Sequence, residues 1–308
     1  METTDQPFKE YPPFVRIHND GTVERHTGTQ TLPPSPLSDA GVSSKDVVIS
    51  PNVSARLYIP HSALSSTKKL PTLVYFHGGG FIIESPFSPH YHPYQDALAA
   101  KAGVIIVSVN YRLAPEHQLP AAYDDSWEAI KWTVGLSDEW LRDHADLDRL
   151  FLAGDSSGGN IVHQMAMRAG ETASSEVRLR GVVLVHPFFW GPNLSDTENE
   201  QSGFVEKLWK LFSPDVGAMQ SHWVNWEAEG ATPLTKLGCR RVMVCVAELD
   251  FIKKKGKEYY EALKESGWEG KVELVETEGE NHVFHLFKPD CEKARVFMEQ
   301  VVSFLNQV

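Results

Sequence analysis

The stretch Gly154-Asp155-Ser156-Ser157-Gly158-Gly159-Asn160 is the most informative part of this sequence. It follows the apolar run 150–153 and precedes a segment, 161–169, that is predicted to be helical. A serine with glycines two positions before and after it, between a strand and a helix, is the pattern of a nucleophile elbow, whose sharp turn exposes the serine hydroxyl. A glycine-rich loop or a phosphate-binding turn could carry the same residues. The other groups that an activated serine requires therefore decide between these interpretations.

The composition is that of a globular protein with a large core. The chain has 308 residues, of which 42% are hydrophobic and 23% charged, and α/β folds of this length often form one domain. The net charge of −12 argues against a nucleic-acid partner, because phosphate binding needs clustered Lys and Arg. The one basic cluster, 253–257, is short and flanked by acids, so we interpret it as a solvated loop and helix start.

The cellular setting is inferred from the start of the chain and from its cysteines. Residues 1–5 lack the basic and apolar regions of a secretory signal, and no apolar run approaches the ~20 residues of a membrane span. The three cysteines, Cys239, Cys245 and Cys291, are odd in number and lack metal-ligand spacing. These features favour a reducing, cytoplasmic setting without disulfides. We expect no membrane partner, no metal and no other cofactor.

Short β-branched runs alternate with helical patterns along most of the chain. Apolar residues recur at helical spacing in 123–134 and again in 294–304. Such alternation predicts an α/β fold with one mostly parallel sheet flanked by helices, in which the first strands could be antiparallel. The expected strands are 54–59, 72–76, 104–109, 149–153, 181–186, 241–247 and 271–275.

Two segments lie outside this alternation. Residues 1–45 lack periodicity and contain the breaker-rich run 33–36, so no long helix is expected there. Residues 188–235 contain four tryptophans and three prolines, with one plausible short helix near 204–212. Irregular insertions of this length are usually functional. We therefore predict a single domain over 1–308, with 1–45 as an N-terminal cap segment and 188–235 as a lid or pocket wall.

A glycine run supplies the expected hydrogen-bond donors for an oxyanion. His77-Gly78-Gly79-Gly80 follows the predicted strand 72–76 and matches the HGGG motif of lipases and esterases. Glycines leave the backbone N–H groups unobstructed. The N–H groups of Gly78 and Gly79, together with that of Ser157, would form an oxyanion hole with three donors.

The base and the acid should follow the serine in the chain. His282 lies in a short loop between a predicted strand and the last helix, where it could reach Ser156; His285 is its competitor. Glu248 and Asp250 both follow the strand 241–247, and Asp250 is favoured because it lies farther past the strand end. Other histidines are more simply structural, although the role of His186, at a strand end near the insertion, stays open.

These motifs resemble those of the hormone-sensitive-lipase-like branch of the α/β-hydrolases. The runs 111–117 and 119–125 are also similar to that branch, and with Trp127, Trp140 and 266–268 they resemble plant carboxylesterases. The similarity extends from about residue 11 to the C-terminus. It implies an α/β-hydrolase fold and esterase activity without a cofactor. It also implies a triad of Ser156, Asp250 and His282, with Gly78, Gly79 and Ser157 as oxyanion donors.

Members of this family that do not hydrolyse esters define the alternatives. Gibberellin receptors have lost the histidine equivalent to His282, and hydroxyisoflavanone dehydratases can carry threonine in place of Ser156. Alkaloid cyclases alter the motif glycines, which are intact here. One departure from the family is Asn225, followed by Trp226 where Asn-Pro is expected, so the pocket should differ.

The sequence therefore predicts a serine carboxylesterase that hydrolyses esters of small or medium metabolites through an acyl-enzyme on Ser156. Its partner would be a small-molecule ester, and the oligomeric state is left open. A non-hydrolytic dehydratase or cyclase of plant specialised metabolism, or a hormone-receptor-like ligand-binding protein, remains an alternative. Hydrolysis of model esters separates these classes.

Overall fold

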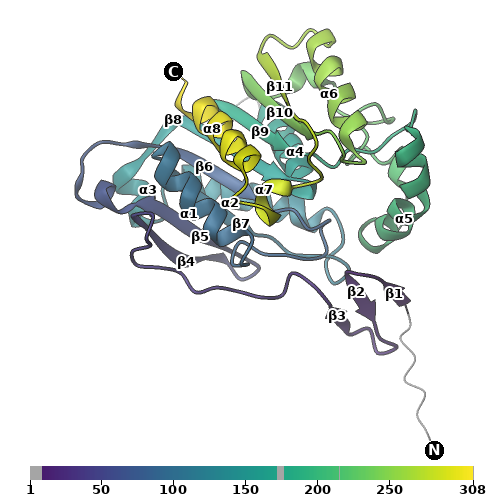
Figure 1. Cartoon of the computed structure of the whole chain (residues 1–308), viewed down its shortest axis with the longest axis horizontal. Coiled ribbons are helices and arrows are strands. Elements are labelled where there is room, and N and C mark those ends of the chain that lie inside the picture. Colours follow the sequence, from purple (N-terminus) through teal and green to yellow (C-terminus); the bar gives the residue numbers. More distant parts are fainter. Residues whose placement is uncertain (1–8, 172–176, 215, 308) are drawn as a thin grey trace, which may run out of the picture.

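An eight-stranded, mostly parallel sheet forms the centre of the computed structural model, which describes residues 9–171, 177–214 and 216–307 (Figure 1). The strand order is β11-β10-β9-β8-β6-β7-β5-β4. Strands β6 to β11 pair in parallel, whereas β5 pairs antiparallel with both β4 and β7. The strands are β4 (Val42–Ser50), β5 (Val53–Pro60), β6 (Leu70–Phe76), β7 (Ile105–Asn110), β8 (Ala145–Asp155), β9 (Gly181–Val185), β10 (Arg241–Ala247) and β11 (Lys271–Thr277).

Helices cover both faces of the sheet. Alternate residues of its buried strands point to opposite faces, so each strand contributes side chains to two hydrophobic clusters. In β6, Leu73 and Tyr75 join one hydrophobic cluster and Val74 and Phe76 join the other. The first cluster includes residues of α1 (Tyr91–Ala102), α7 (Phe284–Phe287) and α8 (Glu292–Asn306). The second includes residues of α2 (Ala121–Val134), α3 (Glu139–His144), α4 (Ser157–Glu171) and α6 (Lys253–Glu265).

The predicted fold class is confirmed, and each of the seven expected strands is present as one of β5 to β11. Strand β4 and helix α1 were not expected. The first half of β4, Val-Ser-Ser-Lys-Asp, is mostly polar although its first three residues are buried, so its sequence lacks a strand pattern. Helix α1 carries Pro93 in its first turn, where proline is tolerated although it is usually taken as a helix breaker.

The two segments outside the alternation come together beside the sheet. The N-terminal segment forms a small antiparallel sheet of β1 (Lys9–Tyr11), β2 (Val15–Ile17) and β3 (Val23–Arg25), three strands too short to give a periodic signal. The insertion forms α5 (Asp196–Phe212), longer than expected, and η2 (Ala218–Gln220) and η3 (Leu234–Lys236); η1 (His61–Ser65) follows β5. Residues 1–8 and 215 of the predicted cap and lid lie outside the described residues.

Direct contacts join the N-terminal segment to α5. The rings of Phe14 and Phe204 have centroids 6.1 Å apart, and Lys207 Nζ donates a hydrogen bond to the Glu10 carbonyl at 3.1 Å. Helix α5 itself begins with a capping box between Ser195 and Glu198, which explains why it starts well before the predicted residue 204. The N-terminal segment and α5 therefore pack directly against each other.

Two helical glycines offer a matched test of the packing. A Cβ at Gly170 of α4 would lie closer than 3.0 Å to the Lys236 carbonyl, so we expect Gly170→Ala to lower the free energy of unfolding by about 1–3 kcal/mol. A Cβ at Gly203 of α5 would meet nothing within 4 Å, so Gly203→Ala should raise that free energy by up to about 1 kcal/mol. Urea unfolding of both variants measures the difference. Equal shifts of the same sign would contradict the close packing of α4 on Lys236.

Candidate active site

Ser156 occupies a sharp turn between β8 and α4. Its backbone φ is +54°, a value that residues other than glycine adopt at a cost of about 1–3 kcal/mol. The turn is held by backbone hydrogen bonds. The Ser156 N–H donates to the Val185 carbonyl at 2.9 Å, and the Ser156 carbonyl accepts from Asn160 at 3.1 Å and from Phe188 at 2.9 Å. The strained conformation is therefore fixed by strand β9, helix α4 and the start of the insertion.

The flanking glycines are required because no room exists for a side chain. A Cβ at Gly154 would lie closer than 3.0 Å to the Gly158 and Phe76 carbonyls. A Cβ at Gly158 would lie closer than 3.0 Å to the carbonyls of Phe76 and His77. The end of β6 thus presses directly on the turn, as a nucleophile elbow requires.

Asp250 and His282 are joined by a short hydrogen bond, with Asp250 Oδ2 and His282 Nδ1 2.6 Å apart. The Asp250 carboxylate is buried and also accepts the N–H of Ile252 at 3.2 Å. The competing acid, Glu248, is exposed and accepts the N–H of Gly279 instead. Among the two acids after β10, the geometry therefore favours Asp250 as the partner of His282.

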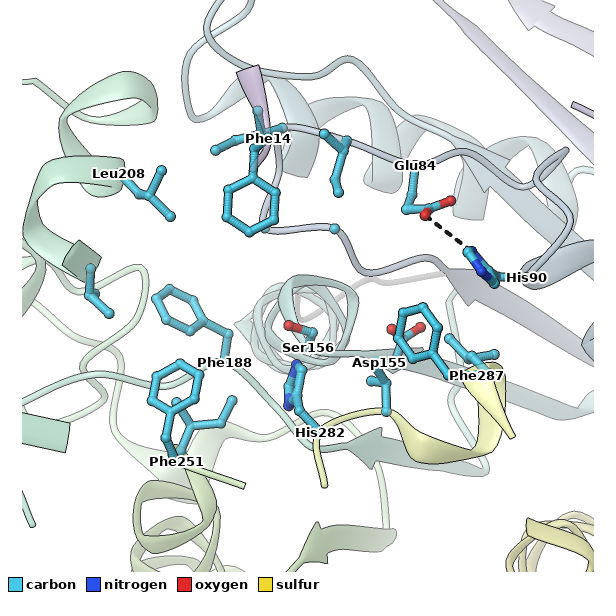
Figure 2. Close-up of a pocket in the computed structure, with 18 of the residues that line it drawn as sticks. Phe14, Glu84, His90, Asp155, Ser156, Phe188, Leu208, Phe251, His282 and Phe287 are labelled. Atoms are coloured by element: carbon cyan, nitrogen blue, oxygen red, sulfur yellow. Dashed lines mark hydrogen bonds and ion pairs between the residues drawn. The ribbon is translucent and has the colours of Figure 1, made fainter. Parts of the chain in front are cut away.

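His282 and Ser156 line the same cavity, and Figure 2 shows their side chains next to each other. His285 does not line this cavity. It is buried against the rings of Tyr94 and Phe297, whose centroids lie 5.0 and 4.8 Å from its own. The structure thus brings Ser156, Asp250 and His282 together and leaves His285 in the core.

The contact between Asp250 and His282 shifts the pKa of both groups. Burial alone would raise the pKa of Asp250, but the charge and hydrogen bond of His282 outweigh it and hold that pKa below its usual value. Burial likewise opposes the charge on His282, yet the Asp250 carboxylate raises the pKa of the imidazole above its usual value. An acid that stabilises the imidazolium in this way is what a general base beside a serine needs.

His186 supports the loop that carries His282, a role that the sequence left open. His186 Nδ1 accepts the N–H of Val283 at 2.8 Å, and burial lowers the pKa of His186 well below its usual value, so the ring stays a neutral acceptor. His186 and Val283 both have positive φ, 45° and 44°. Such a φ is rare for the β-branched Val283 in particular. Only the folded chain brings residue 283 to the end of β9, so no local pattern could reveal this contact.

The first glycine of the run 78–80 is engaged elsewhere. The Gly78 N–H donates to the Tyr91 hydroxyl at 2.7 Å, and that hydroxyl donates to Asp155 Oδ2 at 2.7 Å. The prediction that named Gly78 as an oxyanion donor is corrected on this ground, since its N–H already has a buried acceptor. Gly79 and Gly80 line the cavity, and neither N–H donates to another described residue. Ser157 is the first residue of α4, whose N–H has no intrahelical acceptor.

Asp155 anchors this side of the site. The Tyr75 hydroxyl donates to its Oδ1 at 2.9 Å, and Tyr91 donates to its Oδ2. Burial raises the pKa of Asp155 to about 6, against the lowering effect of both tyrosines. A Cβ at Gly78 would lie closer than 3.0 Å to Asp155 Oδ2, so only glycine fits there. The network ties the glycine run to the residue that precedes Ser156.

The cavity above Ser156 has a volume of about 280 Å³ and mostly apolar walls (Figure 2). Phe14 comes from the N-terminal segment, and Phe188 and Leu208 come from the insertion. Phe251 follows directly after Asp250. The N-terminal segment and the insertion, the two segments outside the strand–helix alternation, therefore both line the cavity that contains Ser156.

The described residues contain one cluster with metal-ligand composition, made of His186, Asp250 and His282, whose ligand atoms lie within 4.8 Å of one another. A metal there would have to replace the hydrogen bond between Asp250 and His282. The expectation of a site without metal or other cofactor stays a prediction.

Comparison with known proteins identifies the family. A family model described as the alpha/beta hydrolase fold matches residues 73–286. The chain is 44% identical to "Probable carboxylesterase 2" of Arabidopsis thaliana, with 100% of this chain and 99% of that protein covered. It is 43% identical to the 2-hydroxyisoflavanone dehydratase of Glycyrrhiza echinata, with 98% and 97% covered. An esterase structure from Pyrobaculum calidifontis has a TM-score of 0.69 at 29% identity, with 85% and 84% covered. The chain belongs to the α/β-hydrolase fold family.

Proposed function

We propose that this protein is a serine carboxylesterase that hydrolyses carboxylic esters of small or medium metabolites. The observation that carries the proposal is the hydrogen bond of 2.6 Å between Asp250 and His282, in a cavity that Ser156 also lines. The carboxylesterase among the relatives and the esterase among the solved structures support the same reaction class. The dehydratase relative shows that the scaffold also serves another reaction, so the assay must separate the two.

The reaction proceeds by acyl transfer. His282 takes the proton of Ser156 as its Oγ attacks the ester carbonyl, while Asp250 holds the ring and stabilises the imidazolium. The protonated His282 then gives its proton to the leaving alcohol, and the acyl group remains on Ser156. Water, deprotonated by His282, attacks this acyl-enzyme and releases the acid.

The oxyanion is stabilised by backbone N–H groups at the meeting point of two motifs. Gly79 and Gly80 supply two donors from the cavity wall, and Ser157 supplies a third from the start of α4. The positive end of the helix dipole adds to the third contact. Loss of a single donor of this kind typically reduces the rate by about 10²–10³-fold.

The remaining expectations concern the setting of the enzyme. No helix among the described residues is long and apolar enough to cross a bilayer. Cys239, Cys245 and Cys291 are all unpaired, which supports a cytoplasmic, reducing environment. We propose a small-molecule ester as the partner, bound within one domain under a cap made of 1–45 and 188–235.

Hydrolysis of p-nitrophenyl butyrate tests the proposal. The purified wild-type protein should turn over this ester, and Ser156→Ala should reduce kcat by at least about 10⁴-fold, because the nucleophile is removed. Release of p-nitrophenol measures both rates. A folded wild-type protein without turnover would favour the dehydratase, cyclase or receptor alternatives.

Two matched pairs of variants test the acid and the base. His282→Ala and Asp250→Asn should each reduce kcat by roughly 10³-fold or more. The first removes the general base, and the second removes the acceptor that holds the imidazole in the correct tautomer. Their controls are His285→Phe, which keeps an aromatic ring in the core, and Glu248→Gln, which keeps an acceptor for Gly279. Both controls should stay within about tenfold of the wild-type rate. The reverse pattern in either pair would overturn the assignment.

The pH profile of kcat/KM reports the base in the free enzyme. His282 must be neutral to accept the Ser156 proton, so the rate falls as pH drops through its pKa. Because Asp250 raises that pKa above 6.5, we expect the midpoint of the acid limb above this value. In the residual activity of Asp250→Asn, the midpoint should move to lower pH, since no carboxylate stabilises the imidazolium. A midpoint unchanged by the substitution would argue against this coupling.

A further inference from the structure

The cavity has two chemically different ends on either side of Ser156 (Figure 2). Phe188, Leu208 and Phe251 form one end, which is apolar. The opposite end contains the polar side chains of Glu84 and His90, next to the ring of Phe287. An ester whose carbonyl lies at Ser156 would therefore place its acyl and alcohol parts in unlike surroundings.

The two carboxylates at the second end, Asp155 and Glu84, differ in how many hydrogen bonds their oxygens accept. Both oxygens of Asp155 accept hydrogen bonds from tyrosine hydroxyls, so this carboxylate is satisfied. Glu84 has a single long contact, 3.4 Å from its Oε1 to His90 Nδ1, and its buried Oε2 has no hydrogen-bond partner. The Glu84 side chain is 11% exposed. A carboxylate can accept about four hydrogen bonds, and burial without partners is unfavourable.

The backbone holds Glu84 in place at a further energetic cost. Its φ is +75°, a left-handed conformation that glutamate adopts rarely. The preceding turn is closed by the N–H groups of Ile82 and Ile83, which both donate to the Gly79 carbonyl at 3.0 Å. Glu84 is thus attached to the same turn as the proposed oxyanion donors. Strain of this kind on a cavity wall is a common mark of ligand contact.

We propose that Glu84 is a specificity residue that accepts a hydrogen bond from a hydroxyl group of the substrate. The favoured substrates are then esters with a hydroxyl-bearing group on one side of the carbonyl and an apolar or aromatic group on the other. A hydroxyl suits the site better than an ammonium group, because the cavity walls are mostly apolar and an ion would lose its hydration there. This inference rests on the esterase function proposed above.

Two pairs of nearly isosteric esters test the proposal on either side of the carbonyl. Propyl phenylacetate and 2-hydroxyethyl phenylacetate differ by one hydroxyl in the alcohol, and benzyl propanoate and benzyl glycolate differ by one in the acyl group. In at least one pair, the wild-type protein should prefer the hydroxylated ester by about tenfold or more in kcat/KM, as expected for a hydrogen bond to a carboxylate.

The variant Glu84→Met should abolish this preference, because it removes the hydrogen-bond acceptor. Methionine keeps the length of the side chain and must adopt the same positive φ. Glu84→Asp, with a shortened acceptor, should give an intermediate ratio. The exposed Glu265 of α6 provides the matched control, and Glu265→Met should keep the wild-type ratio. Titration of active sites with an organophosphate verifies that each variant is folded and puts all rates on the same scale.

The outcomes separate this inference from the proposed function. Absence of turnover of all four esters and of p-nitrophenyl butyrate would refute the esterase itself. Turnover without preference in either pair, in the wild-type protein alone, would overturn the role of Glu84. A preference that persists in Glu84→Met would overturn it as well, and would place the hydroxyl against another group of the cavity.

Discussion

The contact between the end of β6 and the turn at Ser156 is the constraint on which the rest of the site depends. The carbonyls of Phe76 and His77 leave no space for a Cβ at Gly158, so strand, turn and helix can approach closely only with glycine there. Backbone hydrogen bonds to Val185, Asn160 and Phe188 then hold Ser156 at its positive φ. It also brings the glycine run after β6 beside the start of α4. This backbone contact therefore brings Ser156 and the proposed oxyanion donors together.

The sequence predicted the parts of the site that have a local signature. The apolar strands, the elbow glycines and the order of Ser156, Asp250 and His282 are all visible in the chain. The choice of Gly78 was wrong because a motif identifies the glycines but not the partners of their N–H groups. Tyr91 takes the Gly78 N–H only because α1, which no local pattern predicted, packs on the same face of the sheet.

The features that sequence reasoning missed depend on backbone conformation or on distant contacts. The positive φ values of Glu84, His186 and Val283 cannot be inferred from residue type, since none of them is a glycine or an asparagine. The unsatisfied carboxylate of Glu84 and the support of His282 by His186 become visible only in three dimensions. The insertion contributes Phe188 and Leu208 to the cavity, whereas its four tryptophans, which drew attention to it in the sequence, do not line that cavity.

The central claim is that Ser156 attacks an ester carbonyl whose oxygen is held by three backbone N–H groups. A crystal structure of the protein after reaction with a p-nitrophenyl phosphonate tests it most directly, because the tetrahedral phosphonate resembles the intermediate. We expect a bond from phosphorus to Ser156 Oγ. We also expect a phosphoryl oxygen within hydrogen-bonding distance of the N–H groups of Gly79, Gly80 and Ser157. An unmodified Ser156, or a phosphoryl oxygen bound by the Gly78 N–H instead, would contradict it.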